Sequence, residues 1–234
     1  MSHLPYRIER TNNRSSRAVF ADDMILIRLA GRLTQTEEQR HIDTLLKRMT
    51  KAQARYAARH LIDPFRPVLD GAQESILTFG DGSSRTVITK PAAITNGKIV
   101  NGMIVINKAP ATSENIFHRF LWRMLSFAES DRIQALIHSI NRETLCVQIT
   151  GFRLRIMRSR LGSCSRRGMI TINAALLFLP LKLLRYVVIH ELAHIPHPNH
   201  SRAFWRTVKG VLPEYETHIR ELKKYRLPEF DLDH

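Results

Sequence analysis

Apolar and polar residues follow two different periods along this chain, and the N-terminal half is dominated by short apolar stretches that predict strands. Residues 17–29 hold two such stretches on either side of Asp22 and Asp23, a pattern typical of a β-hairpin. Residues 75–107 are β-rich and predict several short strands. The expected tight turns lie at Asp81-Gly82, Asn96-Gly97 and Asn101-Gly102.

Residues 34–60 have the helical period and contain neither glycine nor proline. Thr34 is followed three residues later by Glu37, which predicts a capping box at the start of a basic amphipathic helix. Pro64 and Pro67 are expected to end it.

Ser113 precedes a second long helical segment, which we expect to reach about Asn141. Its large apolar residues recur at helical spacing, so one face of this helix is expected to lie in the core. The predicted core stripe consists of Phe117, Phe120, Leu121, Met124, Leu125 and Ala128.

The C-terminal part predicts strands followed by helices. Residues 144–158, which include Cys146, and residues 168–172 alternate as strands, with a polar turn between them. Asn173 is expected to cap a short helix. The last predicted helices span Leu181–Ile195, opened by Pro180 and stopped by Pro196 and Pro198, then Ser201–Lys209 and Pro213–Tyr225.

These elements predict one continuous α+β domain. Residues 1–110 form its strand-rich N-terminal portion with one helix, and residues 111–234 form the rest. The composition is ordinary for a soluble globular protein, since 44% of residues are hydrophobic and 24% are charged. No apolar run approaches the roughly 18 residues of a membrane span, and the first residues lack the apolar region of a secretory signal. We therefore expect a cytoplasmic protein that does not contact a membrane, and its two cysteines exclude a disulfide scaffold.

The charge is unusual, because 36 Lys and Arg residues against 21 Asp and Glu residues give a net charge of +15. Residues 153–168 alone carry six arginines and no acid. Such a surface either binds nucleic acid or keeps the protein in solution, and both interpretations stay open. No known nucleic-acid module is visible in the sequence.

The strongest chemical signal is His190-Glu191-Leu192-Ala193-His194, an HExxH motif within the predicted helix. Residues four apart share one helical face, so both imidazoles can reach one zinc ion. Glu191 lies beside the metal without pointing at it, and we expect it to take a proton from the water that zinc activates.

A third metal ligand is needed, and several residues are candidates. His197 sits between two prolines in the sharp exit from the helix. His200 follows His194 after five residues, which leaves the chain room to turn back, so we favour His200. A more distant carboxylate, such as Glu214 or Glu216, is the remaining alternative. Cys164, in a turn of small residues, has no sequence partner and is interpreted as a small buried thiol.

Several separated motifs now occur in a distinctive order: Arg160 with Gly162-Ser163-Cys164-Ser165, Ile172-Asn173, the helix from Tyr186 to His194, Asn199-His200-Ser201, and Phe204-Trp205. Over roughly residues 155–225 the chain resembles the YgjP-like metallopeptidase family, which is related to the SprT-like and WLM zinc proteases. The resemblance implies a zincin-like fold, in which a small mixed sheet packs against the HExxH helix and its edge strand holds an extended peptide. It also implies zinc ligands at His190, His194 and His200, with Glu191 as the catalytic glutamate. Leu161 departs from the family pattern, which usually has tryptophan there, so we expect the substrate preference to differ from that of the family.

The predicted function is a zinc metallopeptidase that cleaves protein or peptide substrates, using metal-activated water and Glu191 as general base. Arg160, Tyr186 and His197 are unranked candidates for contacts to substrate or transition state. A DNA-associated protease, a non-catalytic zinc-stabilised binding module, and a hydrolase of a non-peptide amide are the alternatives.

Overall fold

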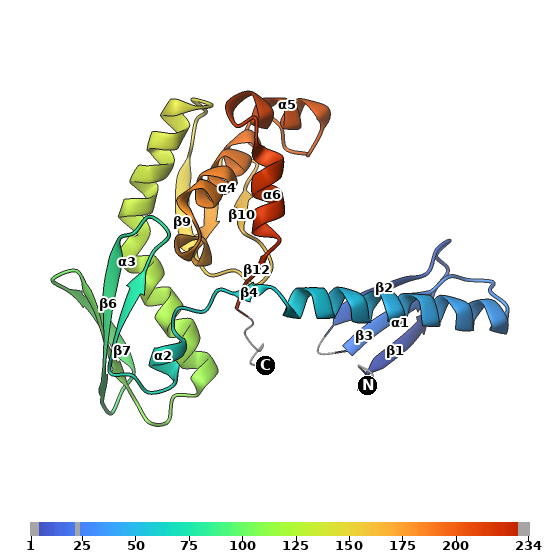
Figure 1. The fold of residues 1–234 in the computed structure, drawn as a ribbon, viewed down its shortest axis with the longest axis horizontal. Helices are drawn as coiled ribbons and strands as arrows, with labels where there is room; N and C mark the ends of the chain where they lie inside the picture. The colour runs from blue at the N-terminus through green and yellow to red at the C-terminus, as the bar shows by residue number, and fades with distance from the viewer. Residues whose placement is uncertain (1–4, 22–23, 229–234) are drawn as a thin grey trace. The chain divides into compact units, whose positions relative to one another are not determined.

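The protein is described by a computed structural model, which covers residues 5–21 and 24–228 (Figure 1). Its contacts divide the chain into two compact units, Met1–Arg59 and His60–His234. The boundary at residues 110/111 that the sequence suggested lies inside the second unit. Within the described residues, no helix combines the length and the apolar character needed to cross a membrane.

The first unit is a three-stranded sheet with one helix. Its strands β1 (Tyr6–Arg10), β2 (Arg17–Ala21) and β3 (Met24–Leu29) are arranged in the order β1-β3-β2. The antiparallel β2–β3 pair confirms the predicted hairpin, although its turn at Asp22-Asp23 lies outside the described residues. Every second residue of β3 is buried (Ile25, Ile27 and Leu29), and these side chains pack with Ile42 of helix α1.

Helix α1 (Gln35–Ala57) begins where the sequence predicted. The Thr34 side chain accepts a hydrogen bond from the Glu37 backbone N–H, and the Glu37 carboxylate accepts one from the Thr34 backbone N–H 2.8 Å away. The predicted end was wrong, because the helix stops at Ala57, well before the two prolines. Residues His60–Leu61 instead form strand β4, which pairs in parallel with β12 (Tyr225–Arg226). Pro67 lies in the short helix α2 (Arg66–Leu69).

The second unit contains a four-stranded mixed sheet in the order β5-β6-β8-β7. Asn101 and Gly102 have φ angles of 49° and 77° and form the predicted tight turn between β7 and β8. The turn predicted at Asn96-Gly97 was wrong, because both residues lie in strand β7. A Cβ atom at Gly97 would lie 3.1 Å from the Met124 side chain, so this glycine packs closely against a neighbouring helix and does not form a turn. The strands are β5 (Glu74–Thr78), β6 (Ser84–Pro91), β7 (Asn96–Val100) and β8 (Met103–Lys108).

Helix α3 (Glu114–Glu143) packs against this sheet and confirms the second predicted helix. Ser113 caps its N-terminus by accepting a hydrogen bond from the Ile116 N–H. Phe117, Leu121 and Leu125 of the predicted stripe are fully buried, and the other three residues of the stripe pack against the same core.

A second, three-stranded sheet carries the candidate site. Strand β11 (Met169–Asn173) pairs in parallel with β9 (Gly151–Arg155) and antiparallel with the edge strand β10 (Gly162–Cys164). The sequence had placed β10 in a polar turn, and it had extended the preceding strand over residues 144–158. Cys146 was therefore wrongly placed in a strand, since it lies before β9 in the left-handed region, with φ 50°, and is exposed.

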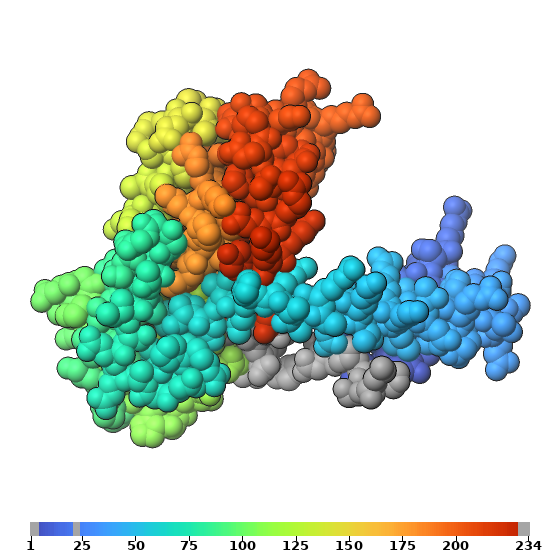
Figure 2. Space-filling model, in the orientation of Figure 1, coloured from blue at the N-terminus to red at the C-terminus, as the bar shows by residue number. Residues whose placement is uncertain are grey.

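Short helices complete the second unit. Asn173 caps the 3₁₀ helix η1 by accepting a hydrogen bond from Ala175, as predicted. Helix α4 packs against β10 and β11, and α5 and α6 pack against α4, where Figure 2 shows their atoms as one continuous surface. This α+β arrangement of a small mixed sheet against the HExxH helix confirms the predicted fold class. The elements are η1 (Ala174–Phe178), α4 (Leu181–Ala193), α5 (Arg202–Val211) and α6 (Tyr215–Leu222).

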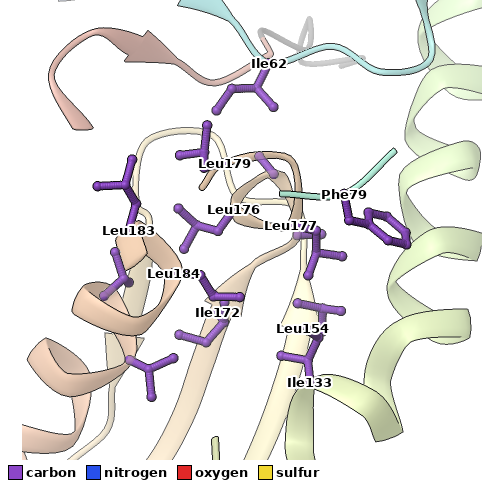
Figure 3. Close-up of a cluster of buried hydrophobic side chains, with 14 of the residues drawn as sticks. Ile62, Phe79, Ile133, Leu154, Ile172, Leu176, Leu177, Leu179, Leu183 and Leu184 are labelled. Carbon is purple, nitrogen blue, oxygen red and sulfur yellow. The ribbon is translucent and has the colours of Figure 1, made fainter. Parts of the chain in front are cut away.

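The core of the second unit fixes the base of α4. Figure 3 shows leucines of η1 and α4 meeting Ile172 of β11 and Leu154 of β9, with Ile133 of α3 beside them. Leu176 and Leu183 are fully buried in this cluster. Burial on this scale stabilises each large aliphatic side chain by about 1.5–3 kcal/mol, so α4 is held firmly in place.

Removal of one buried charge tests how α3 is held. Glu129 on α3 is fully buried and accepts hydrogen bonds from Arg85 at 2.8 Å and Arg132 at 2.6 Å. We expect Glu129→Gln to lower the free energy of unfolding by about 3 kcal/mol, because two guanidinium groups lose their buried counter-charge. Glu143→Gln on the same helix removes a carboxylate that is 52% exposed and paired with Arg185, so its effect on the free energy of unfolding should be much smaller. Urea denaturation measures both, and equal losses would contradict the prediction.

Candidate active site

Helix α4 places two imidazoles and a carboxylate at its C-terminal end. His190 and Glu191 lie in its last turn, and His194 is the residue that caps it. Leu183, Val187 and Val188 are buried along the same helix, so the end of α4 has little freedom to move. The four-residue spacing then directs both imidazoles to one side, as the motif predicted.

The chain turns back after α4 and brings His200 to the other two histidines. The turn starts with a hydrogen bond from the His197 N–H to the Ala193 carbonyl oxygen and ends at Ser201, which caps α5. One ring nitrogen from each of His190, His194 and His200 lies within 4.8 Å of the others, and Nε2 of His190 is 3.0 Å from Nε2 of His200.

This nitrogen set fits a zinc ion. Two nitrogens bound to one tetrahedral zinc at about 2.0–2.1 Å lie roughly 3.4 Å apart, which is within the range of the observed separations. Glu214 lies 3.8 Å from His218, and Glu216 accepts a hydrogen bond from Tyr215, so both carboxylates face residues outside the histidine cluster.

Hydrogen bonds orient the rings of two histidines. Nδ1 of His194 lies 3.2 Å from the His197 carbonyl oxygen, and Nδ1 of His190 lies 3.4 Å from the Tyr186 hydroxyl. These contacts leave Nε2 of each ring free to face a metal. The His197 ring itself turns away, with its Nε2 3.0 Å from Thr207 Oγ1. Tyr186 and His197 therefore contact the histidine rings on the side opposite the Nε2 atoms.

Two aromatic side chains, Phe204 and Trp205, pack against the histidine rings. The Phe204 ring is fully buried, and its centroid lies 4.6 Å from that of His194 and 4.9 Å from that of His200. The Trp205 ring stacks on His200 at 5.6 Å and on Tyr215 at 5.2 Å. Sequence reasoning noted Phe204 and Trp205 only as motif positions, although their place directly after His200 was a signal that they pack on it.

Burial sets the protonation of the site. It lowers the pKa of His190 to about 4, and the neighbouring His194 and His200 rings add to the effect. Burial also lowers the pKa of His194. Both imidazoles are therefore neutral at pH 7, which is the form that binds a metal. Burial raises the pKa of Glu191 to about 7, and the positive charge of Arg160 opposes that rise.

Edge strand β10 passes directly beside Glu191. A Cβ atom built at Gly162 would lie 2.6 Å from Glu191 Oε1 and 2.7 Å from its Cγ, so only glycine leaves room for this carboxylate. Sequence reasoning missed Gly162 as a positioning residue, although it belongs to the small-residue stretch that was noted there. Cys164, two residues further on, is half-buried, and burial together with Glu191 raises the pKa of its thiol to about 11. Such a thiol is protonated at neutral pH and is a poor nucleophile.

The fully buried Asn173 holds the segment that leads into β10. Its side-chain NH₂ donates to the carbonyl oxygens of Met157, at 2.9 Å, and Arg160, at 2.7 Å. Its backbone N–H donates to the Leu161 oxygen at 2.9 Å, and the Leu161 side chain packs on the core. Leucine at position 161, where the family usually has tryptophan, thus still makes an apolar contact with the core.

Within residues 5–21 and 24–228, no strand pairs with the outer edge of β10, so its peptide groups are free to bind. Backbone hydrogen bonds join Leu161 to Asn173 and Ser165 to Met169. Because antiparallel pairs alternate, the backbone groups of Gly162 and Cys164 face away from β11. These outward-facing groups lie next to Glu191, so an extended peptide could pair with β10 beside this carboxylate.

Two solved structures are similar to part of this chain. Among solved structures, the metallopeptidase zymogen abylysin of Pyrococcus abyssi is 30% identical, with a TM-score of 0.36, over 39% of this chain and 93% of that chain. The zymogen jannalysin of Methanocaldococcus jannaschii is 19% identical, with a TM-score of 0.33, over 38% of this chain and 94% of that chain. No curated protein matches the chain.

A family model describes nearly the whole sequence. The model for the YgjP-like metallopeptidase domain matches residues 15–225, a range that includes the HExxH helix, the edge strand and His200. The chain therefore belongs to the YgjP-like family of metallopeptidases.

Proposed function

We propose that the chain is a zinc-dependent metallopeptidase in which His190, His194 and His200 bind the metal and Glu191 is the general base. The observation that carries this proposal is the convergence of three histidine ring nitrogens within 4.8 Å, beside a buried carboxylate and an open strand edge. A site of three protein nitrogens with one open position is typical of catalytic zinc. When bound, zinc supplies Lewis acidity to the scissile carbonyl and to the attacking water.

Glu191 is suited to move the proton. A pKa of about 7 lets the carboxylate accept a proton from the attacking water near neutral pH and later deliver it to the leaving amine. Gly162 keeps the carboxylate in place, and the contact shields one side of Glu191 from water. The base thus works from a fixed position.

The substrate binds, in this proposal, as an extended strand on the free edge of β10. Main-chain hydrogen bonds to Gly162 and Cys164 would hold it without regard to its sequence. Tyr186 and His197 act as positioning residues for the imidazoles of His190 and His194. Arg160 is the remaining candidate for a transition-state contact, because its charge acts on Glu191. A cytoplasmic location stays a prediction from the sequence.

Replacing Glu191 by glutamine separates this enzyme from a zinc-stabilised binding module. We expect Glu191→Gln to bind zinc as the wild type does and to lose at least about a hundredfold in peptidase activity, because an amide cannot accept the proton. Zinc content and cleavage of an unfolded protein measure the two properties, with a chelator-treated wild type as control. Full activity in the variant would overturn the assignment of Glu191 as the base.

A single methyl group tests the contact between β10 and Glu191. We expect Gly162→Ala to retain zinc and reduce kcat more than tenfold, because Glu191 must move away from the new Cβ. The matched control is Gly210→Ala on α5, where no atom lies within 4 Å of the added Cβ, and its kcat should stay at the wild-type value. Equal kcat values for the two variants would contradict the positioning role of Gly162.

Two nearby histidines test the ligand set. We expect His200→Ala to weaken zinc binding by more than about a hundredfold. Removing a ligand lowers zinc affinity more than removing a residue that only contacts a ligand. His197→Ala removes a ring that contacts Thr207 and should change zinc affinity only a few-fold. Competition with a chromophoric chelator measures both affinities. The opposite order would identify His197 as the third ligand.

A further inference from the structure

Three arginines line a hollow of about 360 Å³ beside the edge strand. Arg155, Arg158 and Arg160 come from the end of β9 and the loop after it, while Ser163 contributes from β10. All three arginines are exposed. We call this feature the arginine hollow, and among the residues that the structure describes no acidic one lines it.

The arginines of the hollow make no ion pair within the described residues, although the charge of Arg160 acts at longer range on Glu191. Arg85 and Arg132 share the buried Glu129, and Arg185 pairs with Glu143. Within residues 5–21 and 24–228, no ion pair joins a carboxylate to Arg155, Arg158 or Arg160. Like charges gathered around one concave surface attract an anion, which would supply the missing counter-charge.

The backbone that carries these arginines is fixed. Asn173 binds the carbonyl oxygens of Met157 and Arg160, on both sides of Arg158. The hollow is therefore organised before a ligand arrives, and a ligand pays less of the ordering cost than it would on a loose loop.

The arginine hollow lies one strand position from the catalytic glutamate. Gly162 faces Glu191, and side chains alternate along a strand, so Ser163 directs its side chain to the opposite face, where the hollow is. A peptide paired with the free edge of β10 has the same alternation. Successive side chains of the peptide near the scissile bond therefore point to opposite faces of the sheet. A side chain on the face of the hollow contacts the arginines.

We propose that the arginine hollow binds the carboxylate of an Asp or Glu side chain located within two residues of the scissile bond. This inference rests on the proposed peptidase function, which it deepens by giving the substrate class. A guanidinium group binds a carboxylate through two parallel hydrogen bonds, so arginine suits this task better than lysine.

The position of the hollow favours a peptide over nucleic acid. It opens beside a strand edge whose free backbone groups match those of a peptide. A nucleic-acid strand needs a basic track that follows many phosphates, and a single hollow offers contacts to only a few.

Peptide cleavage tests the proposal. The zinc-loaded full chain is incubated with quenched fluorescent peptides that have amidated C-termini. The peptides form sets of three that differ only in carrying Asp, Asn or Lys at one position. Each set varies a different one of the two positions on either side of the cleaved bond. We expect kcat/KM for the Asp peptide to exceed that for the Asn peptide by at least about fivefold at one of these positions, and the Lys peptide to be poorest. Equal rates for the three peptides at every position would overturn the proposal.

Charge reversal connects the preference to the hollow. The double variant Arg155→Glu/Arg158→Glu should prefer the Lys peptide. If this variant does not fold, Arg155→Gln/Arg158→Gln takes its place and should show no preference among the peptides. Arg160 is left unchanged because its charge acts on Glu191. The control is Arg153→Glu, an exposed arginine of the same run that lies outside the hollow, and it should keep the wild-type preference. An unaltered Asp preference in both double variants would place the specificity elsewhere.

Binding separates failure of this inference from failure of the proposed function. Fluorescence anisotropy of the same peptides on zinc-loaded Glu191→Gln measures recognition without turnover. Selective Asp binding without any wild-type cleavage would uphold the hollow and reject the peptidase. Cleavage without selectivity would do the reverse. A single-stranded oligonucleotide that binds more tightly than every peptide, and does so only while Arg155 and Arg158 are present, would overturn the proposal in favour of nucleic acid.

Discussion

The close approach of strand β10 to helix α4 at Gly162 and Glu191 is the constraint on which the candidate site depends. A hydrogen atom in place of a side chain lets backbone and carboxylate meet, and an error of one methyl group would separate them. Both partners are held from behind. Asn173 secures the segment that enters β10, and the core of leucines and isoleucines secures α4. Much of the second unit therefore serves to keep two short segments at a fixed separation.

The parts of the site that lie close together in sequence could be predicted, because a helix converts spacing into geometry. His190, Glu191 and His194 needed only the four-residue period, and His200 needed only a turn of suitable length. Capping residues such as Thr34 and Ser113 were equally informative, since their hydrogen bonds are local. In each of these cases the physical cause lies within a few residues of its effect.

The features that could not be predicted depend on distant partners. Strand β10 has the small, polar composition of a loop and becomes a strand only because β11 pairs with it. Gly97 follows an asparagine, as in a tight turn, yet it lies in a strand and packs closely against side chains of helix α3, which begins many residues later. Gly162 and Asn173 have roles defined by atoms across the fold. Local pattern specifies which elements form, whereas their shared contacts decide where glycine and asparagine are required.

The pairing of β4 with β12 has a consequence for how the catalytic unit can be connected. Residues His60–Leu61 and Tyr225–Arg226 lie side by side as parallel strands, so the first and the last described strands of the second unit adjoin. Adjoining strands of this kind let a fold accept a different preceding segment without stretching its interior. Evolution or an engineer can thus exchange what precedes His60 while the distance between the histidines and the edge strand stays the same.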